Sequence, residues 1–256
     1  MAKVAIDAGH GGSNPGAVFE GRQEKDDNLR LALAVGEILK NNGVDVFFTR
    51  TDDEYQTPYQ KAMLANESGA DWLVSIHRNS SPIPNQYSGV ETLVYDESGK
   101  KVELAENINA QLEDVGFRNL GISERPGLVI LRRSQMPAVL VEAGFINSEE
   151  DNRMFDEHFD EIANGIAQGI LQTLKGDVAG TDNENDVFYR VQTGAFRSRE
   201  NADRLLEKLT REGYPAFILP KGGYYLVQVG AFRNLGNAIR MEGILRSYGY
   251  QTYITT

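Results

Sequence analysis

The chain has 256 residues, of which 41% are hydrophobic, so it can bury a full core as one large domain or two unequal ones. It contains no cysteine, which excludes disulfides, thiolate metal sites and a cysteine nucleophile, so a bound metal would need His, Asp or Glu. The net charge of −11 argues against a nucleic-acid partner, which would require a basic surface.

The charge is unevenly distributed along the chain. From Val187 to the C-terminus there are ten Lys or Arg and five Asp or Glu, a charge of +5, so the residues before Val187 carry −16. Such asymmetry suggests two units with different roles. The acidic stretch DVAGTDNEND at 177–186 has the composition of a linker. We therefore predict a domain over 1–175, a linker over 176–186 and a second domain over 187–256.

The N-terminus carries no apolar signal segment. Met-Ala-Lys leads into a short apolar run that Asp7 interrupts, and no uncharged apolar run is long enough to span a bilayer. We expect synthesis in the cytoplasm without a signal peptide and no insertion into a membrane. The sequence does not indicate an oligomeric state.

Strand and helix patterns alternate through the first 175 residues. In chain order we expect strand 3–7, helix 26–42, strand 44–50, helix 59–68, strand 71–77, strand 89–95, helix 102–115, a strand pair at 128–133 (LVILRR) and 137–145 (PAVLVEAGF), and helix 156–174. This alternation predicts an α/β domain with an open, mostly parallel twisted sheet and helices on both faces.

The C-terminal part is an internal repeat. Residues 189–218 align without gaps on 225–254, and each copy has a strand, a turn, a helix, a Gly-Tyr break and a second strand. One copy has too little core to fold alone, so the pair predicts one small α+β domain made of a βαβ repeat, with two helices on one face of its sheet. The apolar positions at helical spacing are Leu205, Leu206 and Leu209 in the first copy, and Met241, Ile244 and Leu245 in the second.

Strand alternation assigns the two faces of this small sheet. Val191 and Val227 should point to the helices, which places Gln192 and Gln228 on the open face. An open face of this kind is compatible with simple solvation or with binding, and the residues alone do not distinguish the two.

Several potentially reactive side chains lie at or just beyond strand ends, where sites form in open α/β sheets. His10 follows the first strand, His77 and Glu142 close two others, and Glu24 lies in the loop that opens the first helix. Two imidazoles and one carboxylate can hold Zn²⁺ and leave a position for water, whose proton a further carboxylate can accept. His10, Glu24 and His77 suit the first role and Glu142 the second, although spacing alone does not specify zinc.

Other candidate groups have weaker support. Ser75 and Ser80 flank His77, but neither lies in a G-x-S-x-G pattern, which argues against a serine hydrolase. His158 lies on a charged helix face, where we expect it to be solvated.

The motifs IDAGHGG, EKDDNL, FTRT, SIHRNS, GVET and PAVLVEAGFINS, with Gly-Ala at 16–17, occur in this order. Over residues 1–175 the chain thereby resembles the zinc-dependent N-acetylmuramoyl-L-alanine amidases. The resemblance implies one Zn²⁺ per chain, bound by His10, Glu24 and His77, with Glu142 as the catalytic residue.

Four further residues fall within these motifs. Arg78 stands where the family usually has a small residue, and we expect it at the rim of the site, where it would alter substrate contacts. Asn79 lies beside it. Arg50 and Glu91 match family positions and are expected to support the metal ligands or the fold, for instance as an ion pair at the sheet edge.

The signatures VQTGAF and VQVGAF give residues 187–256 a resemblance to the SPOR domain, a module that binds peptidoglycan. The resemblance implies that the open sheet face binds glycan strands stripped of their peptides, with Gln192, Tyr224 and Gln228 as contacts. The +5 charge would also suit RNA, but the paired aromatic signature of an RNA-recognition motif is missing.

Together these features predict a peptidoglycan hydrolase that cleaves the amide between the lactyl group of N-acetylmuramic acid and L-alanine, held on the wall by its C-terminal domain. A zinc-dependent stem-peptide endopeptidase and a non-catalytic wall-binding protein are the alternatives. Without an export signal, the enzyme would reach the wall after lysis or through holin-type pores. It would be a phage endolysin, which we slightly favour, or a mother-cell lytic enzyme of sporulation.

Overall fold

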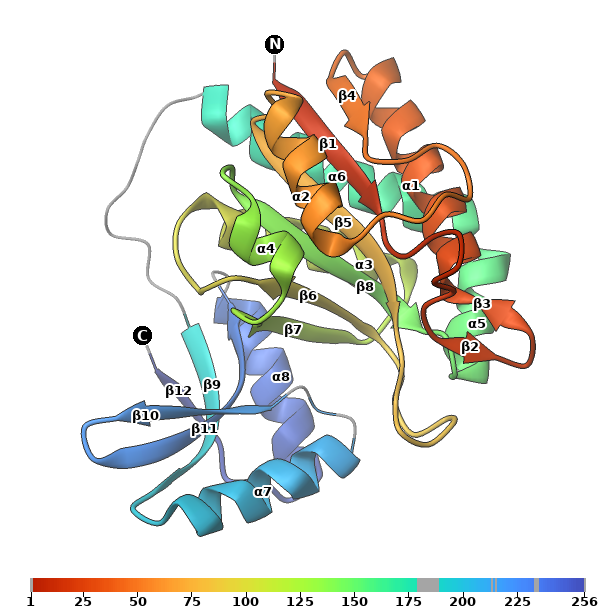
Figure 1. The fold of residues 1–256 in the computed structure, drawn as a ribbon. Helices are drawn as coiled ribbons and strands as arrows, with labels where there is room; N and C mark the ends of the chain where they lie inside the picture. The colour runs from red at the N-terminus through yellow and green to blue at the C-terminus, as the bar shows by residue number, and fades with distance from the viewer. Residues whose placement is uncertain (1, 179–188, 213, 215, 233–234, 256) are drawn as a thin grey trace. The chain divides into compact units, whose positions relative to one another are not determined.

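The structure is a computed structural model that describes residues 2–178, 189–212, 214, 216–232 and 235–255. The chain divides into two compact units, one of Met1–Asn119 with Glu124–Gly180 and one of Leu120–Ser123 with Thr181–Thr256 (Figure 1). The last helix of the first unit continues to Val178, past the predicted start of the linker at 176. The rest of that predicted linker lies outside the described residues.

A six-stranded sheet forms the centre of the first unit. Its order is β4 (Asp45–Phe48), β1 (Lys3–Ala8), β5 (Trp72–Asn79), β8 (Ala138–Phe145), β6 (Val90–Val94) and β7 (Asn119–Glu124). The first four strands run parallel to one another, and β6 is antiparallel to β8. The predicted open, mostly parallel sheet is thereby confirmed, and its apolar runs suit strands that are buried on both faces.

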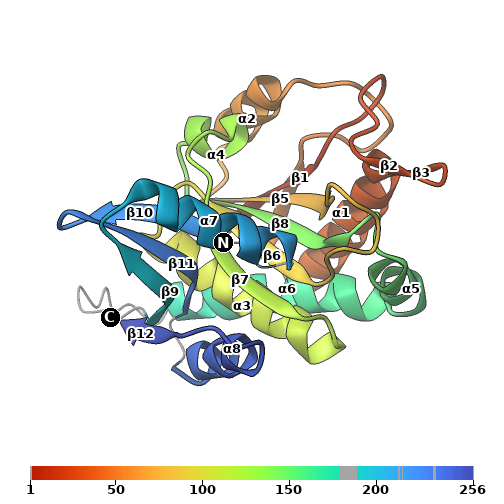
Figure 2. The ribbon, with the colours of Figure 1, turned by 90° about the horizontal axis from the view of Figure 1, so that it is seen from below.

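Helices cover both faces of this sheet (Figure 2). One face carries α1 (Glu24–Asn41), α3 (Lys100–Val115) and α6 (Phe159–Val178); α2 (Pro58–Glu67) and α4 (Val129–Arg133) cover the other. On that second face Ala62 of α2 and Leu131 of α4 pack with Leu73 and Leu140 of the sheet. Helix α5 (Glu149–Glu157) precedes α6, and the short pair β2 (Val18–Phe19) and β3 (Arg22–Gln23) precedes α1.

One of the predicted elements was wrong, and one helix was not predicted. The run LVILRR at 128–133 forms the helix α4, in which Arg132 N donates to Leu128 O, and the strand missed nearby is β7. A short apolar run does not by itself distinguish a strand from one helical turn buried on a sheet. The last predicted helix, 156–174, corresponds to α6, which begins at Phe159, whereas the preceding helix α5, which ends at Glu157, was not predicted.

The first helix begins earlier than predicted, at Glu24. Glu24 therefore belongs to its first turn and not to the preceding loop. Asp26 and Asp27 lie in the same turn, where the positive end of the helix dipole favours acidic side chains. This start fixes the Glu24 side chain to a rigid element.

The second unit is a four-stranded antiparallel sheet with two helices. The strand order is β10 (Phe217–Lys221), β11 (Tyr224–Phe232), β9 (Tyr189–Phe196) and β12 (Tyr253–Thr255), and the helices are α7 (Arg199–Arg211) and α8 (Leu235–Ser247). Leu209 of α7 and Met241 and Leu245 of α8 share one core with Val191 and Val227 of the sheet. Both helices thus pack on one face, as the repeat predicts.

The three residues predicted as contacts of the second unit differ in exposure. Gln192 is partly exposed and Tyr224 is exposed, but Gln228 is fully buried. Gln228 pairs directly with Gln192 across β11 and β9, and the register shifts on both sides of Gln228, which interrupts the simple alternation of side chains along β11.

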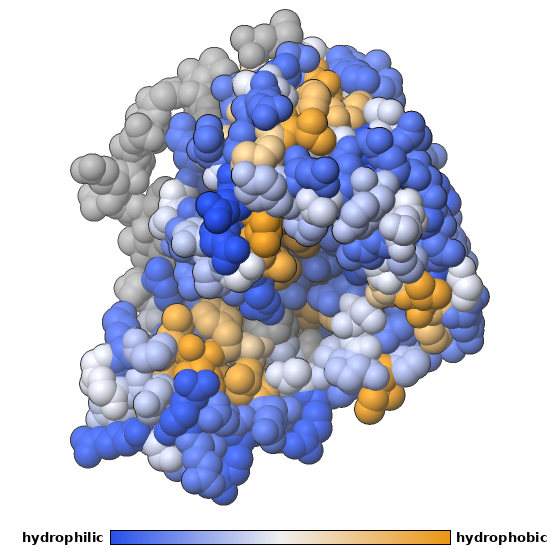
Figure 3. Space-filling model, viewed as in Figure 1, coloured by the Kyte–Doolittle hydropathy of each residue, from blue (hydrophilic) through white to orange (hydrophobic). Residues whose placement is uncertain are grey.

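The surface seen in Figure 3 is mostly hydrophilic, with apolar side chains in separate patches. Within the described part of the chain, no helix combines the length and the apolar character needed to cross a membrane.

Two glycines of α6 provide a matched test of how closely α6 packs on α3. A Cβ at Gly169 would lie 2.6 Å from the Ile108 Cα, whereas a Cβ at Gly165 would lie 3.4 Å from the Gln111 backbone oxygen. We expect Gly169→Ala to destabilise the first unit by about 2 kcal/mol through overpacking. Gly165→Ala should be neutral or stabilising by up to about 1 kcal/mol, because alanine favours helix.

The measurement is denaturant unfolding, monitored by the fluorescence of Trp72. Trp72 is the sole tryptophan of the sequence and is buried on β5. Equal midpoints for the two variants would contradict the close contact between α3 and α6.

Candidate metal centre

Three strands place acidic and imidazole side chains in one row across the sheet. His77 of β5 lies directly opposite Glu142 of β8, and Glu142 lies opposite Glu91 of β6. Residues directly opposite on neighbouring strands project to the same face of a sheet. Strand pairing alone therefore brings these residues together from positions far apart in the sequence.

His10 joins this row through a bend after β1. Its backbone has a positive φ of 59°, a conformation uncommon for a residue with a side chain. Gly9 precedes it, and a Cβ there would lie 2.3 Å from the His77 ring. The absence of a side chain at Gly9 lets this loop pass directly against His77.

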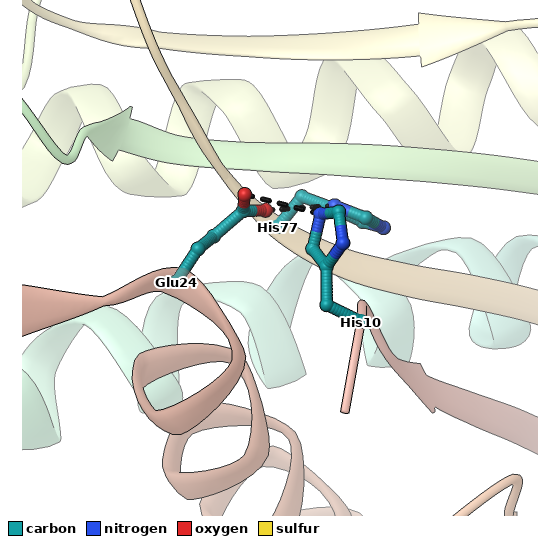
Figure 4. Close-up of side chains that lie close together, drawn as sticks. All are labelled: His10, Glu24 and His77. Carbon is teal, nitrogen blue, oxygen red and sulfur yellow. Dashed lines mark hydrogen bonds and ion pairs between the residues drawn. The ribbon is translucent and has the colours of Figure 1, made fainter. Parts of the chain in front are cut away.

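Glu24 joins the two histidines (Figure 4). Its Oε2 lies 3.1 Å from His10 Nε2, and its Oε1 lies 2.9 Å from His77 Nδ1. The two rings stand edge to face, with centroids 5.0 Å apart, and one potential ligand atom from each residue lies within 4.8 Å of the others. The three predicted ligands thus converge on one point.

The carboxylate of Glu24 is held in place by further donors. The backbone N–H of Ala17 donates to Oε2 at 2.9 Å, and Oε1 accepts from the Arg78 backbone N–H at 3.2 Å and from Asn28 Nδ2 at 3.1 Å. Glu24 is almost fully buried, so these bonds replace the water that its charge would otherwise require.

The charges of this cluster depend on one another. Burial raises the pKa of Glu24, but hydrogen bonds and charge interactions with His10 and His77 outweigh burial and hold that pKa well below its usual value. Burial lowers the pKa of His10, yet its interactions with Glu24 and Asn14 raise that pKa above its usual value. A cation bound here would displace a proton from His10.

Glu142 lies in a different environment. Its Oε2 atom is buried and has no hydrogen-bond partner among the described residues. Burial, together with the negative charges of Glu24 and Glu91, raises the pKa of Glu142 well above its usual value, against the opposing charges of Arg125 and Arg78. A raised pKa brings the proton exchange of such a carboxyl closer to neutral pH.

The donor set fits a metal ion of the zinc type. Two imidazole nitrogens, which are borderline ligands, and one harder carboxylate oxygen form a mixed set that zinc accepts, and three protein ligands would leave a coordination position open. Glu142, the neighbour of His77 across the sheet, stays outside this set.

Arg50 and Glu91 both have partners within the first unit. Arg50 is buried and donates to the carbonyls of Ala8 and Gly9, which lead into His10. Glu91 forms an ion pair with Arg125 at 3.7 Å and accepts a long hydrogen bond from Asn79.

The prediction that Arg78 lies at the rim of the site was wrong. Its side chain is buried and forms an ion pair with Asp27 at 2.7 Å. Arginine does not usually occupy the interior unless it is paired, and no local sequence pattern indicates that Asp27 and the end of β8 supply partners.

A buried polar network beneath the site was not predicted from the sequence. Asp7 accepts from Thr49 Oγ1 at 2.5 Å, from Ser75 Oγ at 2.6 Å and from Lys61 Nζ at 3.0 Å. Burial raises the pKa of Asp7, but Lys61 and the two hydroxyls outweigh burial and lower it. The only hint of this network in the sequence is Asp7 itself, an acidic residue at the end of the apolar run VAID. Ser75 donates to Asp7, which gives it a structural role and not that of a nucleophile.

Comparison with known proteins identifies the first unit. A family model described as N-acetylmuramoyl-L-alanine amidase matches residues 4–172. The chain belongs to this amidase family. The sporulation-specific N-acetylmuramoyl-L-alanine amidase of Bacillus subtilis is 35% identical over 234 residues, which cover 86% of each chain. The endolysin of Bacillus phage SPP1 is 33% identical over 157 residues, 59% of this chain and 58% of the endolysin.

Solved amidases share the fold of the first unit. The crystal structure of an N-acetylmuramoyl-L-alanine amidase from Clostridium difficile superposes with a TM-score of 0.65 at 36% identity, covering 68% of this chain and 97% of that one. The SPOR domain model matches residues 167–220, 185–240 and 221–256. The chain is therefore a peptidoglycan amidase with a SPOR cell-wall-binding domain.

The linked charges of Glu24 and His10 predict a pH dependence for the metal-free amidase. A lowered carboxyl pKa contributes stability above its ordinary value of 4.5, which is lost as the pH falls. A raised imidazole pKa contributes stability below its ordinary value of 6.5, which is lost as the pH rises through the raised value. With a chelator present, Glu24→Gln should therefore lower the melting temperature most between pH 4.5 and pH 6.5, and less at alkaline pH.

Thermal melts of the wild type and variant at several pH values, followed by Trp72 fluorescence, measure this difference. Glu67→Gln, at an exposed position of α2, is the control and should show no such window. A difference in melting temperature between wild type and Glu24→Gln that stays constant with pH would argue against the coupling between Glu24 and His10.

Proposed function

We propose that His10, Glu24 and His77 bind one Zn²⁺ per chain and that Glu142 is the general base and acid of the amidase reaction. The bond cleaved is the amide between the lactyl group of N-acetylmuramic acid and L-alanine. The observation that carries this proposal is the convergence of the three ligand atoms beside a carboxyl whose buried oxygen has no hydrogen-bond partner among the described residues.

Zinc, when bound, would activate a water molecule and polarise the scissile carbonyl. Glu142 takes the proton of the attacking water and transfers it to the alanine nitrogen as the amide bond breaks. Its raised pKa suits both halves of this transfer, because a carboxyl with an ordinary pKa would hold a proton too weakly to deliver it at neutral pH. Glu91, opposite Glu142, contributes to that shift and is held by Arg125.

The first experiment is a digest of purified peptidoglycan with and without a chelator, scored for new amino termini and new reducing sugars. The proposal expects new N-terminal alanine without new reducing ends, lost on chelation and restored by zinc. New amino termini on another residue would show a stem-peptide endopeptidase. Wall binding without cleavage would leave the non-catalytic alternative, against which the complete set of four side chains argues.

Replacing Glu142 separates its role from that of the metal ligands. Glu142→Gln should keep the fold and the zinc content but lower turnover by about 10²- to 10⁴-fold, because the amide cannot accept the proton. Zinc content and hydrolysis of a soluble muropeptide measure this. Glu150→Gln, at an exposed position of α5, should leave both unchanged. Near wild-type turnover in Glu142→Gln would exclude Glu142 as the base.

We also propose that the second unit anchors the enzyme on glycan strands through the sheet face opposite its helices. Gln192 and Tyr224 are accessible for such contacts, and Arg197 lies beside the Tyr224 ring at 5.5 Å. Gln228 is buried and is the weakest of the three predicted contacts. Anchoring would raise the effective concentration of the catalytic unit at neighbouring bonds.

The double variant Gln192→Ala with Tyr224→Ala should weaken sedimentation with peptidoglycan by about tenfold, since aromatic and hydrogen-bond contacts are each worth on the order of 1 kcal/mol. Hydrolysis of a soluble muropeptide should stay unchanged. Glu207→Ala, on the exposed face of α7, is the control. A parallel loss of soluble activity would mean that the substitutions disturb the catalytic unit instead.

The comparisons bear on where the enzyme acts. One relative matched along most of both chains is sporulation-specific, whereas the match to the phage endolysin covers 59% of this chain. We therefore propose action on the wall during sporulation, in place of the phage role that the sequence analysis favoured. The protein should then accumulate as cells sporulate; accumulation confined to phage induction would reverse this assignment.

A further inference from the structure

Arg78 is placed where it can connect the elements that carry the site. Its guanidinium is fully buried and forms an ion pair with Asp27 through Nη1 at 2.7 Å. Nε and Nη2 donate to the carbonyls of Gly144 and Phe145, each at 3.3 Å, and Nη2 also donates to Asn152 Oδ1 at 2.8 Å. One rigid, planar group thus contacts three elements at once.

Two of those elements, and the strand that carries Arg78 itself, hold a residue of the proposed site. Asp27 lies one helical turn after Glu24 on α1, and Gly144 follows Glu142 on β8. Arg78 itself follows His77 on β5, and its backbone N–H donates to Glu24 Oε1 at 3.2 Å. The Arg78 side chain therefore links the first turn of α1, which carries Glu24, to the end of β8 beyond Glu142, in addition to the strand pairing that places His77 opposite Glu142.

The guanidinium has little freedom to move. It lies over the Phe155 ring at 4.2 Å, and the Asp27 oxygen that it contacts also accepts from Arg22 Nε at 2.7 Å. Arg22 is anchored in turn by two bonds to Asp156, each 2.8 Å long. A lysine could fill the space but could not reproduce the planar set of donors.

Burying a guanidinium is costly, and apolar replacements of buried ion pairs are often neutral or stabilising. The fold of this region could therefore be built without an arginine. What an apolar side chain could not do is hold the ends of β5 and β8 and the first turn of α1 at a defined spacing through directed hydrogen bonds.

We propose that Arg78 is a positioning residue, which sets the spacing between the zinc ligands Glu24 and His77 and the base Glu142. This inference rests on the proposed function of those residues. Supporting groups of this kind typically change metal affinity or activity 10- to 100-fold when they are altered.

The test uses the full chain with Arg78→Lys and Arg78→Met. The control is Arg30→Lys, because Arg30 lies over the Phe159 ring at 3.7 Å but is exposed, and none of its described interactions involves a site residue. Zinc affinity is measured by competition with a chelator, and kcat and KM are measured separately on a soluble muropeptide. Melting temperatures establish that the measured protein is folded.

We expect Arg78→Lys to weaken zinc binding and to lower kcat, each by about 10-fold or more, with KM changed less than about threefold. Arg30→Lys should retain wild-type values. A folded Arg78→Lys protein with wild-type zinc affinity and kcat would overturn the inference, whatever its melting temperature, and would leave the proposed site intact.

If neither Arg78 variant folds, Asn152→Ala is decisive, because it removes one acceptor and keeps the guanidinium. It should weaken zinc binding or kcat in the same direction by about threefold to tenfold, and no change would overturn the inference. A wild-type protein that binds no zinc would instead refute the proposed metal site itself, and the inference with it.

Discussion

The buried carboxylate of Glu24 is the interaction on which the site depends. It joins His10 and His77, which come from the ends of different strands, and it is itself fixed by the backbone of Ala17 and by Asn28. Without these donors a buried charge would be strongly destabilising, and without the charge the imidazoles would have no common partner. The candidate metal site and the folded loop around it are therefore one structure, not a site placed on a finished fold.

The parallel sheet explains why these residues meet. Strand ends converge at one edge, and the pairing of β5 with β8 and of β8 with β6 places His77, Glu142 and Glu91 in a row. Two different environments result. One stabilises the charge of Glu24, and the other opposes the charge of Glu142, which is the division that the proposed roles of metal ligand and proton carrier require.

Much of this arrangement could be predicted from the sequence, because strand ends and polar residues beyond them are local patterns. His10, His77 and Glu142 were recognisable in that way, whereas the helical start at Glu24 was misplaced. The failures involve long-range packing. The helix at 128–133 depends on burial against the sheet, and the buried position of Arg78 depends on Asp27, Phe155 and the end of β8, none of which a local pattern reveals.

The strand order of the second unit has a consequence for its origin and its integrity. The second strand of each repeat copy, β10 or β12, pairs with the first strand of the other copy, so the copies are interleaved. The central pair, β9 and β11, runs antiparallel, which gives the unit an approximate twofold axis. A half-length ancestor with one copy could complete this sheet only as a homodimer. Duplication and fusion of its gene would then join the two subunits of that dimer in one chain, so that the pairs β10–β11 and β12–β9 no longer depend on association.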